Sequence, residues 1–150
     1  MIYFFLVFLI SFTSSAEELN ELDSPFLFFE RTACYGTCPQ YIVKIYTSRE
    51  IIYHGKMFVD KIGCFSSVLS LEQLSLLKTF INEVNFFSLE EKYDAFVSDL
   101  PSIITEVSIN NEKHRVIDRF NGPVELEKIY QFIDESIMSI ENWEELSCLD

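Results

Sequence analysis

The sequence is poor in the patterns on which common catalytic and metal sites depend. It has only two histidines, His54 and His114, which stand singly, and only four glycines. No glycine-rich phosphate loop, Gly-x-Ser-x-Gly turn or His-Glu-x-x-His helix occurs. We therefore assign no catalytic residue from a motif, and the sequence predicts neither a cofactor nor a metal site.

Basic residues are also scarce. The chain carries 11 Lys and Arg against 24 Asp and Glu, a formal net charge of −13 at pH 7. A field of this sign repels nucleic acid and anionic lipid surfaces, so no nucleic-acid partner is expected. The last thirty residues are the most acidic part. They either keep the protein soluble or form an acidic face that docks on a basic partner.

No apolar run is long enough for a membrane-spanning helix, which takes about 20 residues. Residues 2–10 form an uncharged apolar block, and Ser14-Ser15-Ala16 follows it. This order is typical of a secretory signal peptide cleaved after Ala16, although no Lys or Arg precedes the block. We expect an exported protein, periplasmic or secreted, without a stable membrane span after cleavage. An uncleaved N-terminal anchor is the alternative.

The expected organisation is one domain behind a short leader. A signal peptide at 1–16 and an acidic flexible leader at 17–25 precede a single domain at 26–150. Hydrophobic residues make up 49% of the chain and aromatic residues 15%, so this domain can bury a substantial core. We expect it to be a monomer.

Four cysteines are present, which allows three pairings in an exported chain. We favour Cys34–Cys38, which closes a very small loop, together with Cys64–Cys148, which ties the C-terminal tail to the middle of the domain. Zinc binding is the rival explanation. The Cys-x3-Cys spacing of the first pair, followed by Pro39 and a strand, argues against both a zinc knuckle and a thioredoxin-like redox motif.

Hydrophobic periodicity separates two kinds of element. Alternating residues predict strands at 26–32, 40–47, 50–55, 57–65, 103–110 and 113–120. A capping box of Ser70 and Gln73 begins a helix that ends near Asn85, and Pro123 begins the last helix. Residues 90–100 have little period and predict a loop. The order predicts an α+β fold with an antiparallel sheet of five to six strands and two helices on one face.

Several separate motifs carry a family resemblance. Residues 32–41 read Thr-Ala-Cys-Tyr-Gly-Thr-Cys-Pro-Gln-Tyr, residues 85–89 read Asn-Phe-Phe-Ser-Leu, and residues 99–102 read Asp-Leu-Pro-Ser. With Gly122-Pro123 at the last helix, these resemble a bacterial family of exported, uncharacterised domains of unknown function over about residues 28–143. The resemblance implies this fold and export but no activity. Relative to it, Cys64 and Cys148 look like additions of this chain, which favours their pairing with each other.

The candidate binding surface lies on two loops. Its residues are Tyr35, Gly36, Thr37, Tyr93, Asp99 and Pro101. We expect a non-catalytic binding or protein-interaction domain of the cell envelope, whose partner is an envelope protein or a small ligand. The first alternative is a hydrolase that uses Asp99 and His54, which requires a pocket bringing Asp99 close to His54 or Tyr93. The second is an acidic inhibitory or structural module.

Overall fold

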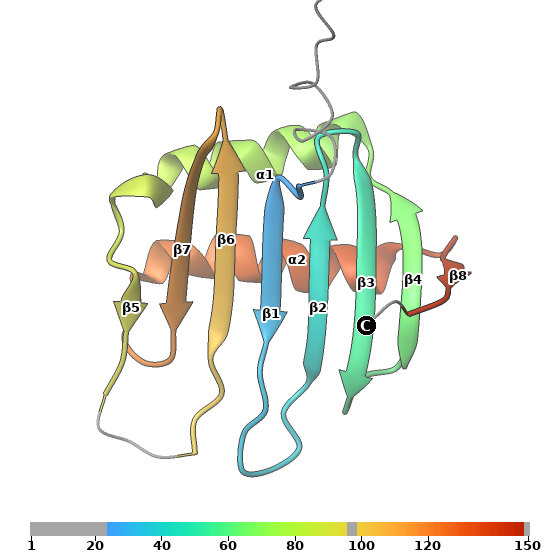
Figure 1. Ribbon diagram of the computed structural model, residues 1–150, viewed down its shortest axis with the longest axis horizontal. Helices are drawn as coiled ribbons and strands as arrows, with labels where there is room; N and C mark the ends of the chain where they lie inside the picture. Colours follow the sequence, from blue (N-terminus) through green and yellow to red (C-terminus); the bar gives the residue numbers. More distant parts are fainter. Residues whose placement is uncertain (1–23, 96–98, 149–150) are drawn as a thin grey trace, which may run out of the picture.

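The structure, a computed structural model, describes residues 24–95 and 99–148, which form an eight-stranded sheet with two helices behind it (Figure 1). The strands are β1 (Leu27–Arg31), β2 (Gln40–Ile45), β3 (Glu50–Met57), β4 (Gly63–Val68), β5 (Lys92–Tyr93), β6 (Ile103–Ile109), β7 (Glu112–Asp118) and β8 (Glu144–Leu146). The helices are α1 (Leu71–Glu83) and α2 (Glu127–Ser139), with 3-10 turns η1 (Phe86–Ser88) and η2 (Val124–Leu126). The expected signal peptide at 1–16 lies outside the described residues.

The strands lie in the order β5-β7-β6-β1-β2-β3-β4-β8. Every neighbouring pair is antiparallel except β5 and β7, which are parallel. The α+β class is confirmed, but the expected five to six strands are wrong. The two strands that the sequence analysis did not expect are the edges, β5 and β8. They have two and three residues, too few to show alternation, and their pairing depends on tertiary contacts.

The strand β4 also begins later than expected. Residues 57–65 were predicted as one broken strand, whereas β4 starts at Gly63. Phe58 and Gly63 both have positive φ, 56° and 114°, and these conformations turn the chain between β3 and β4. The carbonyl oxygen of Lys61 in this turn accepts a hydrogen bond of 3.2 Å from the Tyr53 hydroxyl.

Local sequence signals explain the other elements. Ser70 Oγ accepts a hydrogen bond from Gln73 N at 3.0 Å, and Gln73 Oε1 accepts one from Ser70 N at 2.8 Å, so the capping box that begins α1 is confirmed. Asn110 and Asn111 have φ values of 50° and 63°. Both values suit the tight hairpin turn that was expected between β6 and β7.

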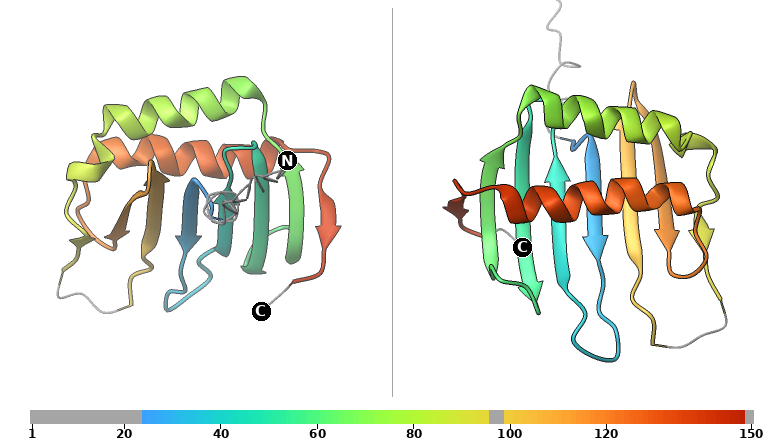
Figure 2. Two further views of the ribbon diagram at one scale, coloured as in Figure 1. Left: turned by 45° about the horizontal axis from the view of Figure 1, so that its top comes forward. Right: turned by 180° about the vertical axis from the view of Figure 1, so that it is seen from behind.

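Both helices pack on the same face of the sheet (Figure 2). Strand side chains that alternate towards this face are buried, as Leu27 and Phe29 are on β1. The helices contribute the buried stripes Leu74, Leu77 and Ile81 on α1, and Ile129, Tyr130, Phe132 and Ile133 on α2. Each such side chain contributes about 1.5–3 kcal/mol by burial, so this layer is the main source of stability.

The opposite face of the sheet is covered by no helix among the described residues (Figure 1). His54 lies on this face, because its neighbours Tyr53 and Gly55 are buried on the helix side. None of the helices in the described part of the chain is both long enough and apolar enough to cross a membrane. Within residues 24–95 and 99–148, one face of the sheet is therefore covered by helices and the other, called the open face below, is not.

Candidate functional site

The Cys34–Cys38 disulfide closes the loop between β1 and β2. Inside it, Gly36 N donates a 2.9 Å hydrogen bond to the Cys34 carbonyl oxygen. The Tyr35 side chain stands out at the tip of this tight loop with 91% of its surface exposed. The disulfide loop therefore presents a large aromatic side chain to solvent on a short, covalently closed support.

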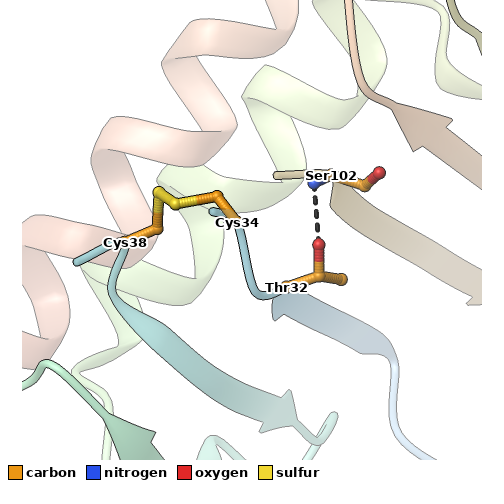
Figure 3. The surroundings of a disulfide bond; sticks show 4 residues. All are labelled: Thr32, Cys34, Cys38 and Ser102. Atoms are coloured by element: carbon orange, nitrogen blue, oxygen red, sulfur yellow. Dashed lines mark hydrogen bonds between the residues drawn. A yellow bond between two sulfur atoms is a disulfide. The ribbon is translucent and has the colours of Figure 1, made fainter. Parts of the chain in front are cut away.

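Two hydrogen bonds join the start of the disulfide loop to the β5–β6 connection. Figure 3 shows the one between Ser102 N and the Thr32 side chain. Thr32 N donates to the Ser102 carbonyl oxygen at 3.0 Å, and Ser102 N donates to Thr32 Oγ1 at 2.7 Å. The two loops predicted to carry the binding surface are thus held side by side, although Thr32 and Ser102 are 70 residues apart in the sequence.

A cleft of about 440 Å³ lies beside this junction, at the end of the sheet where β1 and β7 end and β2 and β6 begin. The loops before β2 and β6, the turn after β7 and the first part of α2 line it. Its lining residues are Arg31, Cys38, Pro39, Leu100, Pro101, Ser102, Ile103, Asp118, Arg119, Phe120, Asn121, Gly122, Glu127 and Tyr130. The volume is that of a small-ligand pocket or of a groove for a few side chains.

Arg31 links one side of the cleft to α2. Its Nη2 donates to Asp134 Oδ2 at 2.6 Å, and its Nε lies 3.2 Å from Asp134 Oδ1 and 3.0 Å from the Tyr41 hydroxyl oxygen. The Tyr41 hydroxyl also donates to Asp134 Oδ1. Burial and the neighbouring carboxylate raise the pKa of Tyr41. Burial alone would lower the pKa of Arg31, but the hydrogen bond to Asp134 and the nearby charges raise it. The group is therefore an ion pair whose phenol stays protonated.

Asp118 organises the turn on the other side of the cleft. Its Oδ1 accepts a 3.2 Å hydrogen bond from Gly122 N, and its Oδ2 accepts one of 3.1 Å from the Tyr130 hydroxyl. A Cβ at position 122 would lie 2.3 Å from Asp118 Oδ2, so the carboxylate fits only against a glycine. Burial, followed by the charge of Asp118, raises the pKa of Tyr130. Asp118, Gly122 and Tyr130 therefore form a second polar group, whose hydrogen bonds are made within the domain.

Arg119 is the least satisfied cation of the cleft. Its Nη1 lies 3.9 Å from Asp94 Oδ1, and Asp94 is already paired with Lys92 at 2.8 Å. That hydrogen bond from Lys92 is the main reason that the pKa of Asp94 is lowered. The buried Nε of Arg119 has no hydrogen-bond partner among the described residues, as is also true of Thr105 Oγ1 and Trp143 Nε1. Arg119 is therefore the cation of the cleft with the weakest partners within the domain, and its side chain is 33% exposed.

The structure divides the predicted binding residues. Pro101 lines the cleft, and Tyr35, Gly36 and Thr37 occupy the exposed tip of the loop that supplies Cys38 and Pro39. Asp99 has a positive φ of 73° in the connection before β6 but does not line the cleft.

Tyr93 stabilises the turn after β7 by hydrogen bonds. Its hydroxyl oxygen accepts a hydrogen bond from Glu90 N at 3.0 Å. Its carbonyl oxygen accepts hydrogen bonds from Arg119 N at 2.9 Å and Phe120 N at 3.3 Å. Tyr93 therefore holds the turn that carries two of the lining residues, and it does not itself line the cleft.

The contact between Asp99 and His54 that the hydrolase alternative invokes is not present. His54 lies on β3, and Asp99 precedes β6, while β1 and β2 lie between β6 and β3 in the sheet. Three strand spacings amount to roughly 14 Å, so Asp99 and His54 are not brought together. The acids of the last helix are also not all free to meet a basic partner, because Asp134 is paired with Arg31.

No sequence motif marks the charged residues of the cleft. Arg31 and Arg119 come at the ends of β1 and β7, and Phe120, which is 42% exposed, follows directly. The available signal was positional: β1 and β7 both run towards the same end of an antiparallel sheet. This signal identifies the two arginines as neighbours only when the order of the strands in the sheet is known, and the sequence does not determine that order.

A different cluster could hold a metal ion. The ligand atoms of His54, Cys64 and Cys148 all lie within 4.8 Å of one another, the only such group found in the described part of the chain. The two cysteines are joined as a disulfide, as favoured from the sequence, and so are Cys34 and Cys38.

These features define a small α+β domain with one helix-covered sheet face and a loop-built cleft at one end of the sheet. A family model described as a domain of unknown function, DUF6438, matches residues 25–137, and the chain belongs to this family. No curated protein matches the sequence significantly. Membership of an uncharacterised domain family is thereby confirmed, while bacterial origin and the role of residues 32–41 as a signature remain predictions. The strand β8 and Cys148 lie beyond the matched residues.

Proposed function

We propose that this protein is an exported, non-catalytic binding domain of the cell envelope, and that the cleft between the disulfide loop and the β5–β6 connection is its recognition surface. The observation that carries the proposal is the hydrogen-bonded junction of these loops beside a cleft of about 440 Å³. Two loops distant in sequence are fixed to each other there, which reduces the entropy lost on binding.

The chemistry of the cleft favours recognition over catalysis. Arg31 and Asp118 are each saturated by partners within the domain, so neither is poised to exchange a proton with a substrate. Arg119 has only a long ion pair of 3.9 Å to Asp94 and a partly exposed side chain, and the exposed Phe120 follows it in the sequence. A partner segment with an acidic group next to an apolar side chain fits this arrangement. Tyr35 would extend the contact as a large aromatic anchor of the kind that dominates protein interfaces.

Capture from envelope extract tests the proposal. We compare the wild type with a Tyr35→Ala, Phe120→Ala variant, which removes the exposed loop tip and an exposed lining residue of the cleft. The control variant is Leu71→Ala, Met138→Ala, whose residues are each 74% exposed on the two helices. We expect the loop variant to lose partners that the wild type and the helix variant retain, as measured by quantitative mass spectrometry. Identical partner profiles for all three proteins would contradict the assigned surface.

The acidic-module alternative is distinguished in the same experiment. Docking through exposed acids weakens as salt is added, because their charges are screened. A Glu144→Gln, Glu145→Gln variant removes two exposed acids of β8. Loss of partners in that variant and at high salt, with the loop variant unaffected, would favour the acidic module over the cleft.

A further inference from the structure

We propose that reduction of the Cys64–Cys148 disulfide converts this corner of the open sheet face into a site for one thiophilic cation, Zn²⁺ or Cu⁺, held by the His54 imidazole and the two thiolates. The proposal is independent of the cleft. It rests on three ligand residues that are far apart in the sequence and that the fold gathers within 4.8 Å.

Two of the three ligands are fixed by the sheet. His54 on β3 and Cys64 on β4 are directly opposite in the register of these antiparallel strands, flanked by the pairs Tyr53–Phe65 and Gly55–Gly63. Directly opposite residues place their side chains on the same face about 5 Å apart. The pair therefore persists whether or not the disulfide is closed.

The third ligand is brought by β8. Leu146 is paired with Cys64 in the β4–β8 ladder, and Cys148 follows two residues later. Because this ladder is made of backbone hydrogen bonds, it does not require the disulfide in order to form. The thiol of Cys148 therefore remains near Cys64 after reduction, and it is exposed to an entering ion.

The spacing suits a metal ion. With metal–sulfur bonds of about 2.3 Å and metal–nitrogen bonds of about 2.0 Å, ligand atoms around one ion lie roughly 3.3–4 Å apart. Opening the sulfur–sulfur bond lets the two sulfurs move to that separation. His54 forms no hydrogen bond or ion pair with the described residues, so its ring is available. Thiolate and imidazole ligands select Cu⁺ and Zn²⁺ over Mg²⁺ and Ca²⁺, which prefer oxygen.

The reaction balances with a dithiol as the reductant. The dithiol supplies two electrons and two protons, its own sulfurs become a disulfide, and Cys64 and Cys148 become thiols. Binding of the cation then displaces the proton from each thiol. Thiol–disulfide exchange with an external disulfide reverses the sequence: that disulfide takes up the two electrons and becomes a dithiol, the Cys64–Cys148 bond re-forms, and the ion is released. The occupancy of the site therefore depends on the ratio of dithiol to disulfide in the surroundings.

A metal titration of the reduced protein tests the inference. A Cys34→Ser, Cys38→Ser background leaves Cys64 and Cys148 as the only thiols. This protein is reduced with dithiothreitol, freed of the reductant without air, and titrated with Zn²⁺ or Cu⁺ against a coloured chelator. We expect one ion per reduced chain and none in the oxidised form. Excess Mg²⁺ should not compete.

Matched histidine variants identify the third ligand. In the same background, His54→Leu should weaken binding by at least the roughly 10- to 100-fold that loss of an outer-shell partner costs. His114→Gln, at the other histidine, should leave binding unchanged. Circular dichroism checks that each reduced protein keeps its fold. If the background does not fold, the wild type with and without His54→Leu gives the same comparison.

Three results would overturn the inference. One is a reduced, folded protein that binds neither ion. Another is binding that is equal in the His54→Leu variant, because then two thiolates alone would suffice. The third is loss of the fold on reduction, because His54 and Cys64 would then no longer face each other.

Discussion

Arg31 and Asp134 form an ion pair of 2.6 Å between side chains 103 residues apart. Arg31 ends β1 at the edge of the cleft, and Asp134 lies in the middle of α2. The pair is partly buried, with 25% and 35% of the side chains exposed, and the Tyr41 hydroxyl completes it. It therefore connects the sheet, the helix layer and the proposed recognition surface through one polar group.

Removing the carboxylate should destabilise the domain. We expect Asp134→Ala to lower the free energy of unfolding by about 1.5–3 kcal/mol, because it deprives a partly buried guanidinium and a phenol of their charged partner. Urea denaturation measures this change. The control is Glu83→Ala, which breaks the exposed pair with Lys128 and should cost at most about 1 kcal/mol. Equal losses of unfolding free energy in the two variants would show that the Arg31–Asp134 pair stabilises the domain no more than an exposed ion pair does.

Gly55 should be far less tolerant of a side chain than Gly36. A Cβ at position 55 would lie 1.8 Å from the Lys61 carbonyl oxygen, whereas at position 36 the nearest heavy atom is Cys34 Sγ at 3.8 Å. We expect Gly55→Ala to cost about 2–3 kcal/mol or more, because a backbone atom must move, and Gly36→Ala to change stability by less than about 0.5 kcal/mol. Thermal unfolding of both variants checks this, and a tolerated Gly55→Ala would contradict the described β3–β4 turn.

The two disulfides should contribute unequally. Cys64–Cys148 closes a separation of 84 residues and Cys34–Cys38 one of 4 residues. In the chain-entropy model these are worth about 4–5 and about 2 kcal/mol. Replacing each pair by serines and measuring urea denaturation should therefore show a larger loss for the long-range pair. A larger loss of stability on removal of Cys34–Cys38 would contradict this ranking, and would mean that this disulfide stabilises contacts outside the loop that it closes.

Stability should fall at alkaline pH. Burial raises the pKa of Tyr53 from 10.0 to about 12, and it also raises the pKa values of Tyr41 and Tyr130. Above pH 10 the folded state therefore keeps phenolic protons that the unfolded state loses, so the free energy of unfolding decreases as pH rises, by up to about 1.4 kcal/mol per pH unit for each tyrosine.

Comparison of the wild type with Tyr53→Phe isolates one of these protons. The variant should show a shallower fall in stability between about pH 10 and 12, because its buried ring has no proton to retain. Identical slopes in urea denaturation across this range would contradict the raised pKa of Tyr53.

Local signals in the sequence predicted most of the fold. The Ser70–Gln73 capping box and the Asn110-Asn111 turn are decided by neighbouring residues, and the structure confirms both. The strands β5 and β8 are different, because Lys92–Tyr93 and Glu144–Leu146 have no alternation. Their pairing follows from the positions of β7 and β4 in the folded sheet, which local sequence does not determine.

The site was predicted in part for the same reason. The compositionally unusual disulfide loop and the Leu100-Pro101 turn stand out in the sequence, and both line the cleft. Arg31 and Arg119 have no motif around them, and their roles arise from strand ends that the sheet places together. The grouping of His54 with Cys64 depends on the β3–β4 register, which periodicity alone does not fix.

Site-specific photo-crosslinking in intact cells tests the proposed recognition surface most directly. A photoreactive phenylalanine analogue replaces Tyr35 at the tip of the disulfide loop or, as the control, Leu71 on α1, which are 91% and 74% exposed. The account predicts a discrete crosslinked adduct from position 35 that is absent from position 71. Adducts from position 71 alone, or equal adducts from both positions, would contradict it.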